Sequence, residues 1–288
     1  MYLNVQGVHW LQQVIFDAAR VAISVAFLLY ASWSDYRTRE VSNRVWAVYA
    51  PIALVLTLAE LLIYDLSDLT LFGLSAGITI VFSLLLFYTG AFGGADSKAF
   101  MCIALALPFF PTILVKPVLP GGLSPLSQVI FPVTILSNAV LIAALSAVYL
   151  LLRNIARKAS THRPLFEGTL AKESVGKKIM VLLTGQKFPL AALKAKWHIY
   201  PMEDVEELAA AQEGGADRVL NRRLIIVPKD EGRDEVVARL SKAADEGKID
   251  SKVWATPGLP MLIFVTVGLI VALTLGDVVW ILVSHLFG

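Results

Sequence analysis

Six runs of apolar residues, separated by four shorter polar stretches and one long charged segment, set the pattern of this sequence. The runs cover about residues 15–33, 45–64, 69–89, 96–107, 129–152 and 257–286. A helix needs about 20 apolar residues to cross the hydrocarbon core of a bilayer. The fourth run is shorter and ends at prolines, which interrupt helices, so a broken or re-entrant helix is an alternative there. The pattern predicts an all-α integral membrane protein with about six transmembrane helices.

Most charged residues gather in one segment between the fifth and the sixth apolar run. Of the 25 basic and 23 acidic residues of the chain, 34 lie between residues 153 and 252. Within this segment, residues 179–183 and 224–227 predict strands, and residues 234–244 predict a helix. One face of that helix carries Val236, Val237, Leu240 and Ala244. We therefore divide the chain into transmembrane helices one to five (1–152), a charged insert of small α+β type (153–252) and a sixth transmembrane helix (253–288).

Basic residues beside the apolar runs predict the orientation. Clusters of them follow the first and the fifth run: Arg37, Arg39, Arg44, Arg153, Arg157 and Lys158. The turn after the second run carries Asp65 and Asp68 instead. Because cytoplasmic loops are enriched in Lys and Arg, we expect a multi-pass protein of the cell membrane. Its insert then lies in the cytoplasm and both termini lie outside.

Composition narrows the classes of function. Hydrophobic residues make up 57% of the 288 residues, above the about 45–50% of soluble domains. The net charge of +2 comes from mixed signs rather than a basic face, so no nucleic-acid partner is expected. The lone Cys102 excludes an internal disulfide, and the scattered histidines show no metal-ligand spacing. We expect no metal, no cofactor and no cleavable signal peptide.

Two aspartates are the main candidates for chemistry. Asp35 closes the first apolar run and Asp96 opens the fourth, so the predicted topology puts both at the cytoplasmic interface. Two carboxylates held close together cannot both ionise easily, and the pair then shares a proton. Such a pair can take a proton from water and give one to a leaving amine. An ordinary surface ion pair, of Asp35 with Arg37 or of Asp96 with Lys98, is the alternative.

Small residues surround the second aspartate. Residues 89–98 read TGAFGGADSK, with Gly93 and Gly94 just before Asp96. Glycines let an extended backbone approach closely, and a peptidase must hold a substrate strand against its carboxylates. A plain glycine-rich turn between two helices is the alternative interpretation.

Both aspartate segments resemble motifs of known membrane proteases. GGAD at residues 93–96, with Lys98 following, resembles the aspartate motif of GxGD membrane proteases. DYRTREVSN at residues 35–43 is similar to the first aspartate motif of type 4 prepilin peptidases, in which an Asn follows the Asp at about this distance. WATPGLP at residues 254–260 opens the last span as in archaeal preflagellin peptidases, and the charged insert fits that branch as well.

The resemblance implies an aspartic endopeptidase of six transmembrane helices whose catalytic pair, Asp35 and Asp96, faces the cytosol. Gly93 and Gly94 support the second aspartate in this comparison. The implied substrates are archaellin or type IV pilin-like precursors with class III signal peptides, whose short basic leader is removed just before their hydrophobic helix. Two departures stand out: Ala95 replaces the glycine before the aspartate, and a cysteine-rich zinc domain is missing, so no methyltransferase activity is expected.

Other polar residues near the spans are weaker candidates. Lys98 either steers substrate or extends to the headgroups. Asn138 is expected to bond between helices, and Asp277 to cap or pair near the outer end of the sixth run. Glu60, near the outer end of the second run, is expected to be an ordinary exposed acid.

Two other classes of function remain as alternatives. In a proton- or cation-coupled transporter, Asp35 and Asp96 would bind the ion. That function predicts acids near the middle of the bilayer, whereas both aspartates are expected at one interface. In a non-catalytic scaffold, replacing both by Asn would change nothing.

Overall fold

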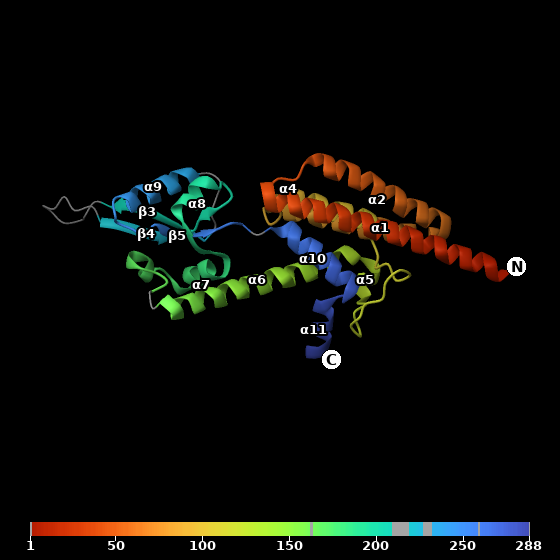
Figure 1. Ribbon diagram of the computed structural model, residues 1–288. Helices are drawn as coiled ribbons and strands as arrows, with labels where there is room; N and C mark the ends of the chain where they lie inside the picture. The colour runs from red at the N-terminus through yellow and green to blue at the C-terminus, as the bar shows by residue number, and fades with distance from the viewer. Residues whose placement is uncertain (1, 162–163, 209–218, 227–231, 259, 288) are drawn as a thin grey trace. The chain divides into compact units, whose positions relative to one another are not determined.

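The computed structural model describes residues 2–161, 164–208, 219–226, 232–258 and 260–287. The chain divides into two compact units, Met1–Ala143 with Pro260–Gly288 and Ala144–Leu259. We call them the helical unit and the insert unit. Figure 1 shows helices in the first and a mixture of strands and helices in the second. The chain is thus mostly helical with a small α+β segment between helices, as the sequence predicted.

The helical unit consists of helices joined by short turns and one long connection. In chain order these are α1 (Tyr2–Thr38), α2 (Asn43–Tyr64), the 3₁₀ turn η1 (Leu66–Asp68), α3 (Leu69–Tyr88), α4 (Gly94–Ala106), α5 (Pro125–Val129), the first part of α6 (Phe131–Thr161), α10 (Met261–Thr274) and α11 (Val278–Phe287). α4 packs against α1, α2, α3 and α10. It is therefore surrounded by other helices of the unit.

Among the described residues, four helices are long and apolar enough to cross a membrane: Trp10–Thr38, Asn43–Tyr64, Leu66–Tyr88 and Phe131–Ala159. α10 and α11 together form a fifth candidate, but they meet at an angle of 64°. Four or five of the about six predicted spans are therefore found by length and composition among the described residues. α4 has 13 residues and rises only about 20 Å, less than the roughly 30 Å of hydrocarbon in a bilayer.

The last candidate span bends because a glycine and an aspartate interrupt it. Gly276 has a φ of 91°, a conformation that residues with a Cβ rarely adopt. A Cβ on Gly276 would also lie 2.3 Å from the carbonyl oxygen of Gly122, so another backbone segment packs against the break. The Trp280 N–H then donates to Asp277 Oδ1 at 3.0 Å at the start of α11. The helix predicted over residues 257–286 is thus two helices.

Small side chains let α4 lie close to its neighbours. Ala99 and Ala106 are fully buried, and Ile103 packs in the same core with Leu28 of α1 and Tyr49 of α2. Close packing of this kind leaves little room for α4 to slide. The position of its first turn therefore follows from the contacts along its whole length.

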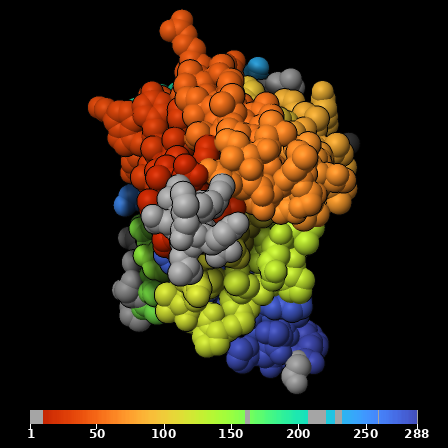
Figure 2. Space-filling view, turned by 90° about the vertical axis from the view of Figure 1, so that its right-hand side faces the viewer, coloured from red at the N-terminus to blue at the C-terminus, as the bar shows by residue number. Residues whose placement is uncertain are grey.

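The connection from residue 107 to residue 130 is irregular apart from α5. Its backbone is bonded to the end of α10 and the start of α11: Val118 N–H donates to Thr274 O and Asp277 N–H donates to Gly122 O, both at 2.8 Å. Figure 2 shows this connection, in yellow to yellow-green, beside α11 in dark blue. Backbone groups that leave a helix are thereby satisfied within the protein.

The insert unit holds two small antiparallel sheets. One has the strand order β1 (Gln186–Pro189), β5 (Lys252–Thr256), β2 (Tyr200–Pro201), and the other pairs β3 (Glu203–Leu208) with β4 (Val219–Leu224). The remaining elements are η2 (Gly168–Lys172), α7 (Val175–Thr184), α8 (Leu190–Ala195) and α9 (Arg233–Asp245). In the first sheet, Phe188 of β1 faces Val253 of β5 in the register.

The secondary structure predicted for the insert is right in one place and wrong in another. Residues 234–244 fall within α9, where Val237 and Leu240 are buried. Residues 179–183, predicted as a strand, lie in α7, which Ser174 caps by accepting the N–H of Lys177. A short apolar run cannot distinguish a strand from one face of a helix. Of residues 224–227, only Leu224 lies in a strand, and residue 227 lies outside the described residues.

Candidate active site

Asp35 lies in the last turn of α1 and is half-buried. The helix ends just beyond it, because Arg39 takes the left-handed conformation with a φ of 59° and its N–H donates to Asp35 O at 2.9 Å. The left-handed conformation is unusual for a residue with a long side chain. The guanidinium of Arg39 acts electrostatically on the Asp35 carboxylate. The chain thus turns sharply where the first candidate carboxylate stands.

Asp96 lies in the first turn of α4, where a carboxylate is favoured by the helix dipole. Its Oδ2 accepts the N–H of Gly93, the N-cap residue, at 3.1 Å. A Cβ at position 93 would lie 3.1 Å from that same oxygen. The absence of a side chain at Gly93 therefore leaves space for the Asp96 carboxylate. At Gly94 the nearest atom to such a Cβ is a ring carbon of Phe87 at 3.6 Å, an ordinary contact. Of the two glycines, Gly93 is the one where a side chain would crowd the Asp96 carboxylate.

Ala95 packs against the core of the helical unit. Its methyl group is thus accommodated among apolar neighbours. The departure from the glycine of the GxGD pattern therefore has a structural explanation in this chain.

The two aspartates lie at the same end of two packed helices. α1 and α4 are in contact, and Arg20 of α1 reaches Ala106 at the opposite end of α4, so the helices run antiparallel. The charge of Asp35 acts on the carboxyl group of Asp96. Among the described contacts no hydrogen bond joins the two carboxyl groups directly. The two carboxyl groups are thus close enough for the charge of one to affect the other.

Lys98 links the two aspartate motifs. Its Nζ donates to Asn43 Oδ1 at 2.7 Å, and Asn43 is the first residue of α2. The sequence predicts Lys98 as a steering or headgroup residue and Asn43 as part of the first motif, but no local pattern pairs the two. The bond ties the start of α4 to the start of α2, two residues after Asp96 and eight residues after Asp35 in the sequence.

An apolar cavity of about 260 Å³ lies beside α4 within the helical unit. Phe92 and Phe100, four residues before and after Asp96, line it and stack with ring centroids 5.5 Å apart. Side chains of α3 and α6, among them Phe82 and Leu136, complete the wall. The cavity can take an apolar side chain or chain segment close to the turn that carries Asp96.

The prediction for Glu60 is wrong. Glu60 is 6% exposed, and its Oε2 lies 2.6 Å from Nη2 of Arg20, which also contacts Asp17 Oδ1 at 2.5 Å. The sequence places these residues on two helices, but it does not say which helix faces meet. The predictions for two other residues are confirmed: Asn138 bonds to Gly276 O, and Asp277 accepts from Ser124 and Trp280.

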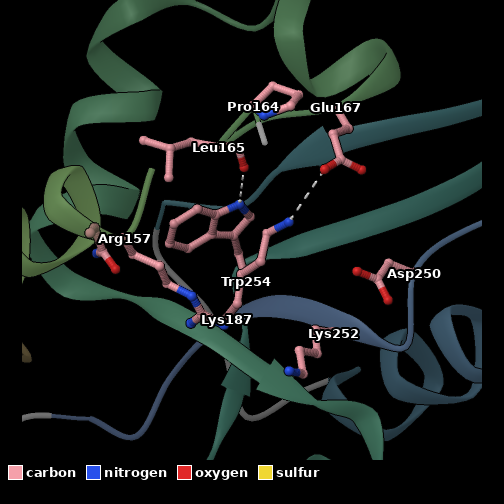
Figure 3. Close-up of a pocket in the computed structure, with 9 residues that line it drawn as sticks. Arg157, Pro164, Leu165, Glu167, Lys187, Asp250, Lys252 and Trp254 are labelled. Atoms are coloured by element: carbon pink, nitrogen blue, oxygen red, sulfur yellow. Dashed lines mark hydrogen bonds and ion pairs between the residues drawn. The ribbon is translucent and has the colours of Figure 1, made fainter. Parts of the chain in front are cut away.

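The insert unit has a polar cavity of about 370 Å³. Figure 3 shows its charged lining residues, which are Arg157, Glu167, Lys187, Asp250 and Lys252. Trp254 forms part of the wall, and its indole Nε1 donates to Leu165 O at 3.2 Å. The charges of both signs include one loose pair, Lys187 Nζ to Glu167 Oε1 at 4.0 Å.

One buried carboxylate joins the two sheets of the insert unit. Burial raises the pKa of Glu203, although Arg222 Nη2 lies 2.9 Å from its Oε2. Its Oε1 accepts the N–H of Trp254 at 3.3 Å. Since these contacts connect β3, β4 and β5, Glu203 has a structural role. By contrast, the pKa of Glu173 is lowered, chiefly because it accepts the N–H of Leu224.

Two protein families and two known peptidases match this chain. Residues 22–152 match the Type IV leader peptidase family, and residues 177–278 match Archaeal Peptidase A24 C-terminus Type II. The preflagellin peptidase of Methanococcus maripaludis is 24% identical over 260 residues, which is 87% of this chain and 92% of the relative. That of Methanococcus voltae is 26% identical over 264 residues, which is 89% of this chain and 94% of the relative.

Helices that can cross a membrane and a match to a peptidase family define the class, an integral membrane peptidase of the aspartic type. The chain belongs to the type IV leader peptidase family, A24, and to its archaeal members. Both aspartate motifs, at residues 35–43 and 93–96, fall within the matched region 22–152.

Proposed function

We propose that this protein is a membrane-embedded endopeptidase that removes short basic leader peptides from archaellin or type IV pilin-like precursors. Asp35 and Asp96 form its catalytic pair. The observation that carries the proposal is that α1 and α4 hold these two carboxylates at one end of the bundle, where the charge of one acts on the other. Family membership and the two preflagellin peptidase relatives support the choice of substrate.

The chemistry is hydrolysis by an activated water. One aspartate, ionised, takes a proton from water while the resulting hydroxide attacks the scissile carbonyl carbon. The other aspartate, protonated, stabilises the carbonyl oxygen by donating a hydrogen bond. The C–N bond then breaks as the leaving amine takes a proton from the pair. Two like charges that share one proton are suited to this exchange.

Features around the pair suit the proposed substrate. Gly93 places no side chain against the Asp96 carboxylate, which suits the close approach of an extended substrate backbone. The apolar cavity lined by Phe92 and Phe100 accepts side chains at the start of the precursor's hydrophobic helix. The basic leader then stays in the cytoplasm, on the side of Arg37 and Arg39. We propose that the two carboxyl groups close on each other only when substrate is bound.

The test is cleavage of a purified archaellin precursor by the protein in detergent. We expect the wild type to cut at the boundary between the leader and the hydrophobic helix. Asp35→Asn and Asp96→Asn should reduce cleavage to background, because Asn neither accepts nor donates the transferred proton. Asp68→Asn is the matched control, since Asp68 is an exposed acid in the turn after α2, at the far end of that helix from Asn43. Normal cleavage by folded Asp35→Asn or Asp96→Asn would rule out the assignment.

A wild-type protein that cuts no leader peptide would contradict the substrate class. The same purified protein can then be tested for proton-coupled transport in vesicles. Transport that depends on Asp35 and Asp96 would favour the rival function. Transport that is unaffected by the Asn variants would exclude both aspartates from it.

A further inference from the structure

α4 ends in the interior of the helical unit, where its backbone needs outside partners. Leu107, just past its last residue, has φ −131° and ψ 65°, and Pro108 has no N–H to continue the helix. The last carbonyl groups of any helix have no partner within it. Ala106, Leu107 and Pro108 are all buried, so bulk water does not serve these carbonyls.

Side chains from three other helices lie against these carbonyl groups. Thr57 Oγ1 of α2 donates to Leu105 O at 2.7 Å and lies 3.3 Å from Ala106 O. Ser75 Oγ of α3 donates to Pro108 O at 3.0 Å, and Arg20 Nη1 of α1 approaches Ala106 O at 3.5 Å. Thr57 and Ser75 are fully buried, and Arg20 is 8% exposed. We call Arg20, Thr57 and Ser75 the carbonyl clamp.

Two acids keep the charged member of the clamp in place. Arg20 Nη2 lies 2.5 Å from Asp17 Oδ1 and 2.6 Å from Glu60 Oε2, and these acids are 3% and 6% exposed. A buried charge is tolerated only when it is paired. A cation beside the carbonyl end of a helix also interacts favourably with the helix dipole. The two acids thus hold the guanidinium against the end of α4.

We propose that the carbonyl clamp fixes how far α4 is inserted along α1, α2 and α3, and thereby positions Asp96 against Asp35. The clamp holds one end of a helix of 13 residues, and Asp96 lies in the first turn at the other end. A helix moves nearly as a rigid rod, so a shift at Ala106 displaces the carboxylate as well. Arg20, Thr57 and Ser75 are positioning residues, and the catalytic part of this inference rests on the proposed function.

The main test removes one hydroxyl of the clamp without changing side-chain shape. Thr57→Val should lower kcat for the archaellin precursor by about tenfold or more, because small misplacements of a reacting group are costly. KM should stay nearly unchanged, since substrate contacts are kept. Thr57→Ser keeps the hydroxyl and should restore kcat. Ser137→Ala is the control, because the half-buried Ser137 hydroxyl donates to Thr134 O of its own helix, α6, at 2.9 Å.

A second measurement reports the position of α4 and does not depend on catalytic activity. Asn43 and Lys98, which are joined by the 2.7 Å hydrogen bond from Nζ to Oδ1, are replaced by cysteines in a chain with Cys102→Ala. A short thiol crosslinker should join them readily in that chain and much more slowly when Thr57→Val is added. Ser75→Ala, which removes a single bond to Pro108 O, serves as a second variant if Thr57→Val does not fold.

The two readouts separate the outcomes. Slower crosslinking together with a lower kcat supports the clamp. Unchanged crosslinking in folded Thr57→Val and Ser75→Ala overturns it, whatever happens to kcat. If the wild type cleaves no precursor, the proposed function fails, but the crosslinking rate still decides whether the clamp positions α4.

Discussion

The two ends of the α1–α4 pair hold acids in opposite surroundings. At one end Asp17 and Glu60 share the guanidinium of Arg20 at 2.5 and 2.6 Å, and all three are more than nine-tenths buried. At the other end Asp35 and Asp96 are half-buried, and in the described contacts neither forms an ion pair within 4 Å. The first group encloses a cation between its two acids, whereas the described contacts place no such cation against either aspartate of the second.

This difference shows how acidic residues on neighbouring helices can serve different purposes. Loss of the cation beside a buried carboxylate leaves an uncompensated charge, so such a pair holds structure. A carboxylate that faces another carboxylate near the surface has a labile proton and can take part in catalysis. The pairing of each acid, and not its depth alone, therefore separates the two roles.

The largest expected effect is on catalysis at the aspartate pair. Asp96→Asn should lower kcat by about 10²–10⁴-fold, the usual contribution of a positioned acid or base. The same change should leave the thermal unfolding midpoint unchanged or raise it, because it removes repulsion from Asp35. Parallel activity and melting curves in one detergent measure both. A large drop in the midpoint would mean that Asp96 is structural, like Glu60.

The opposite result is expected at the other end of the helices. Arg20→Met leaves Asp17 and Glu60 buried without a cation, which should reduce the free energy of unfolding by about 3–5 kcal/mol. Adding Asp17→Asn and Glu60→Gln to Arg20→Met should restore much of that loss. Denaturant unfolding in detergent measures the change. A loss below 1 kcal/mol for Arg20→Met would show that the triad is not the stabilising group we describe.

A smaller effect is expected at the link between the motifs. Lys98→Met removes the bond to Asn43 Oδ1 and should lower kcat/KM by about tenfold, since a bond to a charged group contributes roughly 1.5–3 kcal/mol when fully formed. Asn43→Ala should give the same loss, and the double variant should be no worse than either single one. Additive losses in this cycle would mean that the two residues act separately.

The smallest effect is expected at the end of α1. Arg39→Gly relieves the left-handed backbone and should raise the free energy of unfolding by up to about 1 kcal/mol. It also removes the cation that acts on Asp35, so activity should change several-fold. Arg39→Asn, which also tolerates this conformation, is the control. If Arg39→Gly lowers stability, contacts of the side chain outweigh the strain of the backbone.

The sequence predicts those features of the structure that a local pattern of residues determines. The long apolar runs, the amphipathic face of α9 and the two aspartate motifs are all properties of short windows. The interhelical bonds of Asn138 were also predictable, because a lone amide in an apolar run needs a partner. The bonding of Asp277 was predictable for the same reason, because an acid near the end of a span also needs a partner.

The failures concern partners that are far apart in the chain. Glu60 reads as an exposed acid because its partner Arg20 lies 40 residues away on another helix. Lys98 and Asn43 are 55 residues apart, so nothing local indicates that they bond. The length of α4 and the bend at Gly276 depend on how the 107–130 connection packs, which an apolar run does not encode.

The carbonyl clamp also has a consequence for how the chain is made. All three of its members, Arg20, Thr57 and Ser75, precede α4 in the sequence, so they leave the ribosome before the helix they hold. α4 is too short to be stable as a span by itself. We therefore expect its insertion to depend on prior assembly of α1, α2 and α3. Nascent chains that carry Thr57→Val should then integrate α4 less efficiently, while the first three helices insert normally.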